Sequence, residues 1–187
     1  MLLVAGTAAG QHAEFAGSGD DRIAIHKPDR ALPALATIHG GAASHPFTVV
    51  ARDGDEAPID TLVYATGPYT GTVPIDLGSA TVTQSLAVDA EGAWDVRIYP
   101  IQAAAGVWER YEGAGDGVLW IEREPRAITV IGNEAGGDFS VVAYNRRGQK
   151  IETVVETDEP YEATHSLEPE ALLLEIRADG PWSVDVE

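Results

Sequence analysis

Four carboxylate side chains lie in one short stretch of the chain and could bind a metal ion. They are Asp53, Asp55, Glu56 and Asp60. Ca²⁺ binds carboxylate and carbonyl oxygens in flexible loops, so the stretch predicts a site for a Ca²⁺ ion that stabilises the fold; no other cofactor is expected. The alternative is an acidic hairpin turn exposed to solvent.

Two histidines and two tryptophans are the other candidate binding residues. His39 and His45 flank a pair of glycines in one predicted loop and offer two imidazole ligands, although a metal site needs at least a third. Trp108 and Trp120 could form a face on which sugar rings or a protein partner stack. The alternative for the tryptophans is packing between the two halves of the chain.

The sequence contains none of the motifs that mark common enzymes. A nucleophile elbow, a phosphate-binding glycine loop and a metalloprotease HExxH pattern are all absent. A pair of carboxylates for glycoside hydrolysis could be drawn from the many acidic residues, but no spacing selects one. We therefore expect a protein without enzymatic activity.

The charge of the chain limits its partners. Its 12 basic and 30 acidic residues give a net charge of -18, which disfavours binding to nucleic acid or to an anionic membrane surface. Such acidity fits a high-salt habitat, an arginine-rich lineage or a cation-rich cell wall. With no cysteine, the chain can form neither a disulfide nor a thiolate site.

The hydrophobic pattern bears on localisation. No stretch is long enough for a transmembrane helix, so membrane insertion is not expected. The apolar start of the chain is too short for an export signal. An extracellular or cell-surface location, which we expect, therefore requires a leader absent from this chain; a virion or the cytoplasm is the alternative.

A repeated stretch indicates how these residues are positioned. Residues 90–96 (Ala-Glu-Gly-Ala-Trp-Asp-Val) return as 178–184 (Ala-Asp-Gly-Pro-Trp-Ser-Val). The similarity extends over most of the chain, aligning 7–25 with 103–121, 36–75 with 128–167 and 86–98 with 174–186. Roughly one third of the aligned positions are identical, which indicates an internal duplication. The acidic stretch aligns with a cationic loop, residues 145–150, so at most one copy could bind Ca²⁺ in this way.

Within each copy, apolar and polar residues alternate as in strands that place one face on a core. The predicted strands lie near 21–26, 35–39, 46–53, 60–66, 70–76, 83–90 and 94–99, and again near 117–123, 126–131, 138–144, 150–157, 161–167, 171–178 and 182–186. We therefore predict an all-β fold of two tandem antiparallel β-sandwich domains related by internal duplication, residues 1–100 and 101–187. Residues 101–110 are expected to connect them.

Positions shared by the two copies are assigned to folding. The aromatic pairs Trp94/Trp182, Phe47/Phe139 and Tyr69/Tyr161 are predicted to lie in or at the edge of the cores. Gly-Asp dipeptides at 19–20 and 115–116 are predicted turns in which the aspartate accepts hydrogen bonds from nearby backbone N–H groups.

Three ordered motifs carry a resemblance. They are Gly-Ser-Gly-Asp-Asp at 17–21, Gly-Pro-Tyr-Thr-Gly-Thr-Val at 67–73 and Ala-Glu-Gly-Ala-Trp at 90–94. Together they resemble an uncharacterised tandem β-sandwich module of bacterial, notably actinobacterial, and haloarchaeal proteins that are exported or attached to the cell surface. The resemblance covers most of both copies and implies that fold and location. It implies no activity and no catalytic residue.

Three functional hypotheses follow. The first is a non-enzymatic surface or secreted interaction module that binds a protein or a polysaccharide. The second is a structural subunit of a virion or surface assembly, a homo-oligomer held by edge-strand pairing, in which residues 2–4 would act as a spare strand. The third is an accessory domain stabilised by Ca²⁺.

Overall fold

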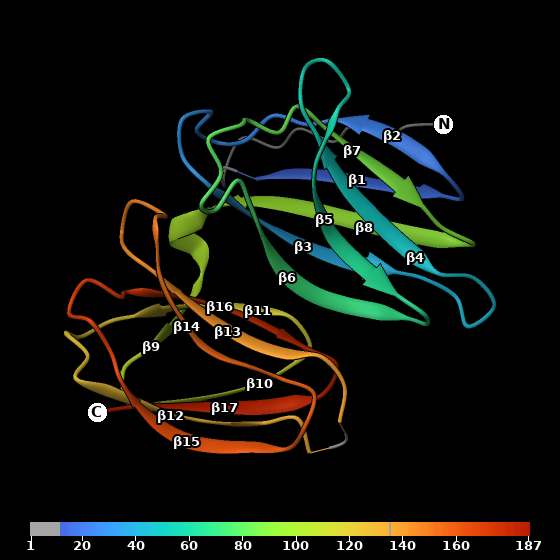
Figure 1. The fold of residues 1–187 in the computed structure, drawn as a ribbon. Helices are drawn as coiled ribbons and strands as arrows, with labels where there is room; N and C mark the ends of the chain where they lie inside the picture. The colour runs from blue at the N-terminus through green and yellow to red at the C-terminus, as the bar shows by residue number, and fades with distance from the viewer. Residues whose placement is uncertain (1–11, 135) are drawn as a thin grey trace. The chain divides into compact units, whose positions relative to one another are not determined.

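The fold of the protein, taken from a computed structural model, is all-β, as predicted (Figure 1). The structure describes residues 12–134 and 136–187, and these contain no α-helix, only the short 3-10 helix η1 (Ile101–Ala103). The contacts within the chain divide it into two compact units, Met1–Ala103 and Ala104–Glu187. The first unit therefore ends at Ala103, whereas the sequence placed the boundary after residue 100.

Unit 1 consists of two four-stranded antiparallel sheets. The first has the order β1 (Ala13–Ser18), β8 (Ala93–Pro100), β3 (Ala34–Gly40), β6 (Tyr69–Ile75). The second has the order β2 (Asp21–Ala24), β7 (Ser85–Asp89), β4 (Phe47–Arg52), β5 (Pro58–Ala65). Side chains from both sheets, such as Val96 and Leu86, belong to one buried hydrophobic cluster, so the sheets share a core as in a β-sandwich.

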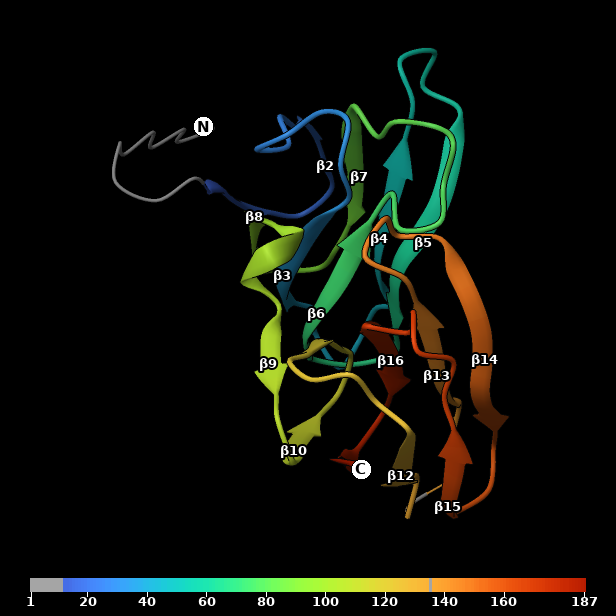
Figure 2. The ribbon, with the colours of Figure 1, turned by 90° about the vertical axis from the view of Figure 1, so that its left-hand side faces the viewer.

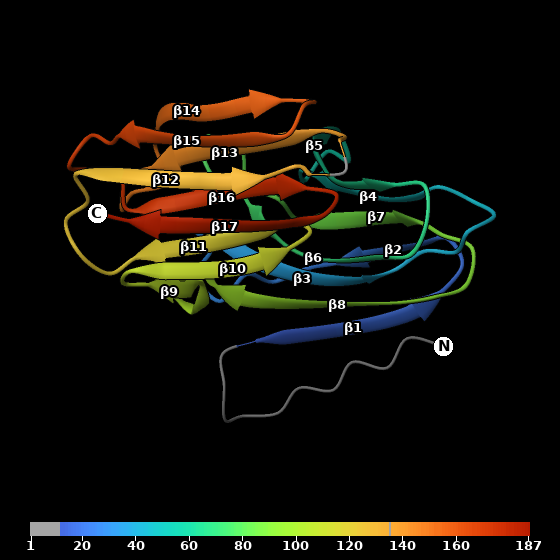
Figure 3. The same ribbon diagram turned by 90° about the horizontal axis from the view of Figure 1, so that it is seen from below.

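Unit 2 repeats this strand order. Its first sheet runs β10 (Arg110–Ala114), β17 (Pro181–Val186), β12 (Ala127–Gly132), β15 (Tyr161–Ser166), and Figure 3 shows these strands side by side. Its second sheet runs β14 (Lys150–Thr157), β13 (Phe139–Tyr144), β16 (Leu173–Ala178), β11 (Gly117–Ile121), β9 (Ala105–Val107). Strand β9, labelled in Figure 2, pairs in parallel with β11 and has no counterpart among residues 12–103. Among the described strands, it is the one departure from the predicted antiparallel pairing.

The tryptophan of unit 1 that the repeat shares, Trp94, is part of the buried core. Trp94 is 3% exposed and donates its indole N–H to the carbonyl of Gly19 at 2.9 Å. Its ring packs directly on Gly17, where an added Cβ would lie 2.8 Å from Trp94 Cε2. Gly40 makes room in the same way for Phe47, since a Cβ there would lie 2.6 Å from the Phe47 ring. These glycines are therefore required by close packing.

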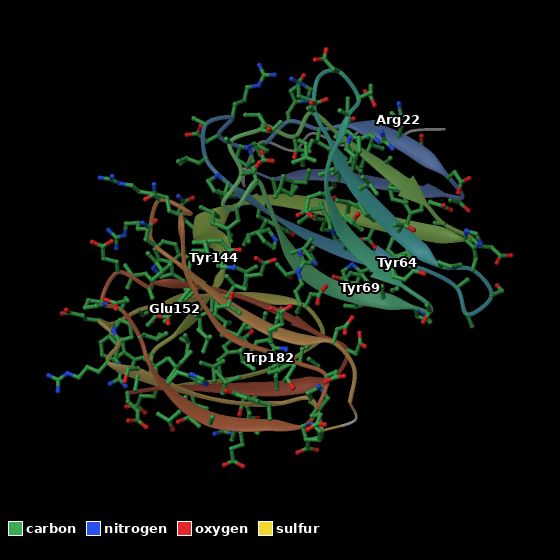
Figure 4. All side chains as sticks on the ribbon, viewed as in Figure 1. Arg22, Tyr64, Tyr69, Tyr144, Glu152 and Trp182 are labelled. Carbon is green, nitrogen blue, oxygen red and sulfur yellow. The ribbon has the colours of Figure 1, made fainter. Side chains whose placement is uncertain are left out.

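Unit 2 has the same arrangement around its own tryptophan. Trp182, labelled in Figure 4, donates to the carbonyl of Gly115 at 2.8 Å and packs on Gly113. Both phenylalanines, Phe47 and Phe139, are buried. The sequence predicted these aromatics to lie in the cores, and this is confirmed.

The aspartate of each predicted turn accepts a backbone hydrogen bond, but from a residue remote in the sequence and not from a nearby one as predicted. Asp20 accepts a hydrogen bond from the backbone N–H of Ala90, and Asp116 accepts one from that of Ala178, each at 3.1 Å. Each donor lies at the entry to the turn that carries the tryptophan, so the aspartate joins two turns that are far apart in the sequence. The repeated motifs are therefore explained by packing and turn geometry.

All the strands predicted in both halves are present, but β1 in unit 1 and both β9 and β10 in unit 2 were missed. Strand β1 was assigned partly to a turn, because Phe15 is its only large apolar side chain. Strands β9 and β10 lie in or next to the segment assigned to a connection, because alanine and glycine give that segment no clear alternation. The spare strand expected at residues 2–4 lies outside the described residues.

Candidate binding site

Trp108 and Trp120, selected from the sequence, line one shallow depression on unit 2. The depression has a volume of about 660 Å³. Its lining also includes four charged residues, Glu122, Arg123, Glu124 and Arg146. Trp108 is 57% exposed, which is unusual for a side chain of this size and apolarity.

The strand pairing explains why the two indoles come together. On β11, Leu119 and Ile121 point into the core, so Trp120 between them points to the outer face. Strand β9 pairs in parallel with β11, placing Gly106 beside Trp120 and Val107 beside Ile121. Because Val107 points into the core, the next residue, Trp108, projects outward at the end of β9.

A cationic side chain completes the aromatic face. The guanidinium carbon of Arg146 lies 5.9 Å from the centre of the Trp120 ring, a cation–π distance. Arg146 belongs to a hairpin turn that is fixed by Asn145, whose Oδ1 accepts from the backbone N–H of Arg147 at 2.9 Å and of Gln149 at 3.1 Å. The cationic loop 145–150, which aligns with the acidic stretch of unit 1, thus contributes to this depression.

Three further charged groups line the site. Glu122 and Glu124 are exposed. Arg123 donates one guanidinium N–H to the carbonyl of Val186, while its buried Nε has no hydrogen-bond partner among the described residues. The depression therefore combines two indole rings with carboxylate and guanidinium groups that can exchange hydrogen bonds with hydroxyl groups.

Unit 1 has no tryptophan at the two corresponding positions. The positions aligned with Trp108 and Trp120 hold His12 and Ala24. His12 is occupied by a stacked contact with Tyr99, with ring centres 5.3 Å apart. Any function of the tryptophan pair therefore belongs to unit 2 alone.

The acidic stretch predicted to bind Ca²⁺ forms a turn in which its carboxylates have other roles. Oδ1 of Asp53 accepts from the backbone N–H of Asp55 at 3.0 Å and of Ala57 at 2.8 Å, as in an aspartate-capped turn. Glu56 forms an ion pair with Arg22 at 2.7 Å (Arg22 is labelled in Figure 4).

The fourth carboxylate, that of Asp60, belongs to strand β5, where Asp60 pairs with Ala51 of β4. Within residues 12–134 and 136–187, no three histidine or acidic side chains are grouped so that they could hold a metal ion. The expected Ca²⁺ ligands are therefore not brought together, because hydrogen bonds and an ion pair already engage two of them.

The two histidines are also directed to different partners. His39 lies 3.3 Å from Asp95, across the sheet that contains β3 and β8. His45 lies 2.9 Å from Asp89 of β7, in the other sheet of unit 1. The hydrogen bond to Asp89 raises the pKa of His45 above 6.5, and the charges of Asp89, Glu91 and Asp20 act in the same direction. Each imidazole therefore lies within hydrogen-bond distance of a different carboxylate.

Sequence reasoning missed a buried charged pair, Lys27 and Asp76, in unit 1. The two residues are far apart in the chain and follow strands of different sheets, so no local pattern joins them. The available signal was the rarity of lysine, since Lys27 is one of only two lysines and follows a predicted strand directly.

Comparisons with known proteins do not assign this chain to a family. No protein-family model and no curated protein matches it. Among solved structures, it is similar to a regulatory subunit of a cAMP-independent protein kinase A from Trypanosoma cruzi bound to guanosine (TM-score 0.27, 9% identity, covering 94% of this chain and 72% of that one).

Two further structures are the major capsid protein P2 from bacteriophage PM2 (TM-score 0.27, 12% identity, covering 98% and 93%) and the PBSX exported protein XepA (TM-score 0.31, 7% identity, covering 98% and 90%). Similarities at this level establish no shared fold or function, so the site must be interpreted from its own residues. Among the described residues, no helix is long and apolar enough to cross a bilayer.

Proposed function

We propose that the protein is a non-enzymatic interaction module of a surface or secreted protein and that unit 2 binds a polysaccharide. The observation that carries the proposal is the placement of Trp108 and Trp120 in one open depression, with Trp108 57% exposed. Indole rings stack on the apolar faces of sugar rings, and the neighbouring charged groups can bind the hydroxyl groups at their edges.

The surroundings of the tryptophans favour a polysaccharide over a protein partner. A protein interface needs a continuous apolar centre that excludes water. Among the described residues, the exposed large hydrophobic side chains are Leu32, Tyr64 and Val82 in unit 1 and Trp108 in unit 2. Within the described part of unit 2, Trp108 is thus the only one of this kind, which suits a narrow ligand that contacts a few rings.

The charge of the protein favours a neutral polymer. A net charge of -18 repels polyanions over distances comparable to the Debye length. Within the depression, two glutamates accompany two arginines, so the site itself presents no excess positive charge. Sugar hydroxyl groups can donate to the carboxylates and accept from the guanidinium groups.

The proposal includes the origin of the two units. We infer that they are tandem antiparallel β-sandwich domains related by internal duplication, supported by the matching order of eight strands in each unit and by the matching tryptophan contacts. In this view, the second copy acquired the tryptophan pair, and with it a binding function, at positions where the first copy has His12 and Ala24.

The test is a glycan array probed with the purified full chain and with three variants. Trp108→Ala and Trp120→Ala are expected to lose the signal, because each removes one stacking face. Tyr64→Ala is the matched control, since Tyr64 is an exposed aromatic residue on β5 of unit 1 (Figure 4) and its loss should leave binding unchanged. Binding that survives in both tryptophan variants would reject the proposed site.

A further inference from the structure

Lys27 and Asp76 form a charged pair inside unit 1 that the proposed binding site does not use. Their side chains are 3% and 6% exposed, and Lys27 Nζ lies 2.5 Å from Asp76 Oδ2. Removing both charges from water is costly, and hydrophobic residues in their place often give equal or greater stability. Stability alone therefore does not explain why the pair is buried.

The surroundings hold both groups in place. Nζ also donates to the carbonyl of Leu32 at 2.9 Å. On the other side, Thr83 donates its hydroxyl to Asp76 Oδ1 at 2.5 Å and its backbone N–H to both carboxylate oxygens at 3.1 Å. Asp76 has a left-handed backbone with φ of 62°, which is uncommon outside glycine. An amine and a carboxyl group are thus fixed in contact where water is largely excluded.

We propose that Lys27 and Asp76 react to form an intramolecular isopeptide bond. The proton passes along the Nζ–H···Oδ2 hydrogen bond, leaving a free amine and a carboxylic acid and removing both charges from the buried site. Nζ then attacks Cγ of Asp76. The negative charge develops on Oδ1, where the hydroxyl and the N–H of Thr83 donate hydrogen bonds.

The reaction balances without an added reagent. The Nζ–Cγ bond forms and the Cγ–Oδ2 bond breaks. Oδ2 leaves as water with two protons, the one received in the first step and one released by Nζ. The fixed contact replaces the encounter of two separate reactants, and this is the main source of acceleration in intramolecular reactions.

The bond would join the two sheets of unit 1 covalently. Lys27 follows β2 of one sheet and Asp76 follows β6 of the other. A chain without cysteine has no disulfide to do this. Extending the alignment by two residues after 25 and by one after 75 places Arg123 and Glu168 at these positions in unit 2. A guanidinium remains protonated and is a poor nucleophile, so the reaction is confined to unit 1.

The test is the mass of the intact full chain, measured under denaturing conditions after prolonged incubation in native buffer. The wild-type protein is expected to be lighter than its sequence by one water molecule. Lys27→Met and Asp76→Ala are expected to have their full sequence masses. Lys150→Met is the matched control, because Lys150 is the other lysine and is exposed, and this variant should still lack the water.

Peptide mapping identifies the atoms involved. A protease digest of the wild-type protein should contain a branched peptide that joins the segments of Lys27 and Asp76. A wild-type mass equal to that of the sequence would overturn the proposal without recourse to any variant. So would water loss that persists in Lys27→Met, or that maps to the Asp76 peptide alone, because a cyclic imide of aspartate has the same mass.

Discussion

Replacing Gly17 by alanine tests the tryptophan packing that the two units share. The new Cβ would lie 2.8 Å from Trp94 Cε2, a distance that real Cβ contacts essentially never show. The ring cannot simply move away, because its indole N–H is bonded to Gly19 and its Cβ side faces Gly40. Either the strand or the indole must shift.

The expected loss of stability follows from these contacts. Overpacking a core costs about 1–3 kcal/mol, and a broken hydrogen bond adds about 1 kcal/mol. We therefore expect Gly17→Ala to destabilise unit 1 by about 2–4 kcal/mol. For a domain of this size, that corresponds to a fall in melting temperature on the order of 10 °C or more.

Differential scanning calorimetry measures this effect, with Gly67→Ala as the matched control. A Cβ at Gly67 would meet no atom within 4 Å, so the same chemical change there should be close to neutral. Gly113→Ala should have a similar effect on unit 2, because Gly113 packs on Trp182. Equal melting temperatures for Gly17→Ala and Gly67→Ala would refute the packing argument.

Two other predictions concern residues that the sequence proposed as metal ligands. The pKa of His45 should exceed 6.5 in an NMR titration, because its imidazolium is hydrogen-bonded to Asp89, and Asp89→Asn should lower it. The contribution of this pair to stability is present below pH 6.5 and is lost as the pH rises through the raised pKa; a value at or below 6.5 would contradict the geometry. Asp53→Ala should reduce the free energy of unfolding by about 1 kcal/mol through loss of its turn hydrogen bonds. Because those bonds form within the chain, adding Ca²⁺ or EDTA should not change the free energy of unfolding of the wild type or of Asp53→Ala. A loss of stability in Asp53→Ala that is seen only with Ca²⁺ present would restore the metal hypothesis.

The sequence was sufficient to predict the all-β class and the positions of most strands, because apolar alternation and turn glycines are local signals. It failed at β1, β9 and β10, whose pairing depends on strands elsewhere in the chain: β1 pairs with β8, β9 lies parallel to β11, and β10 pairs with β17. Such pairing provides hydrogen bonds to short segments that carry few apolar side chains, and no local pattern reports it.

The candidate site shows the same limit. Trp108 and Trp120 were identifiable, because they break the correspondence between the two copies. Their shared depression was not predictable, since it depends on the parallel pairing of β9. Arg146, which lies over Trp120, comes from a turn that was identified in the sequence only as the cationic counterpart of the acidic stretch. Lys27 and Asp76 meet through loops of different sheets and left no signal beyond the scarcity of lysine.

The most direct test of the central claim is calorimetric titration of a neutral oligosaccharide, selected from the glycan array, into three proteins. These are the wild type, Trp108→Ala and Tyr64→Ala. A residue that supplies a main stacking face contributes about 2 kcal/mol or more, so Trp108→Ala should weaken binding at least about tenfold. Tyr64→Ala should bind as the wild type does. Unchanged affinity of Trp108→Ala, or an equal loss in Tyr64→Ala, would contradict the assignment of polysaccharide binding to the tryptophan pair of unit 2.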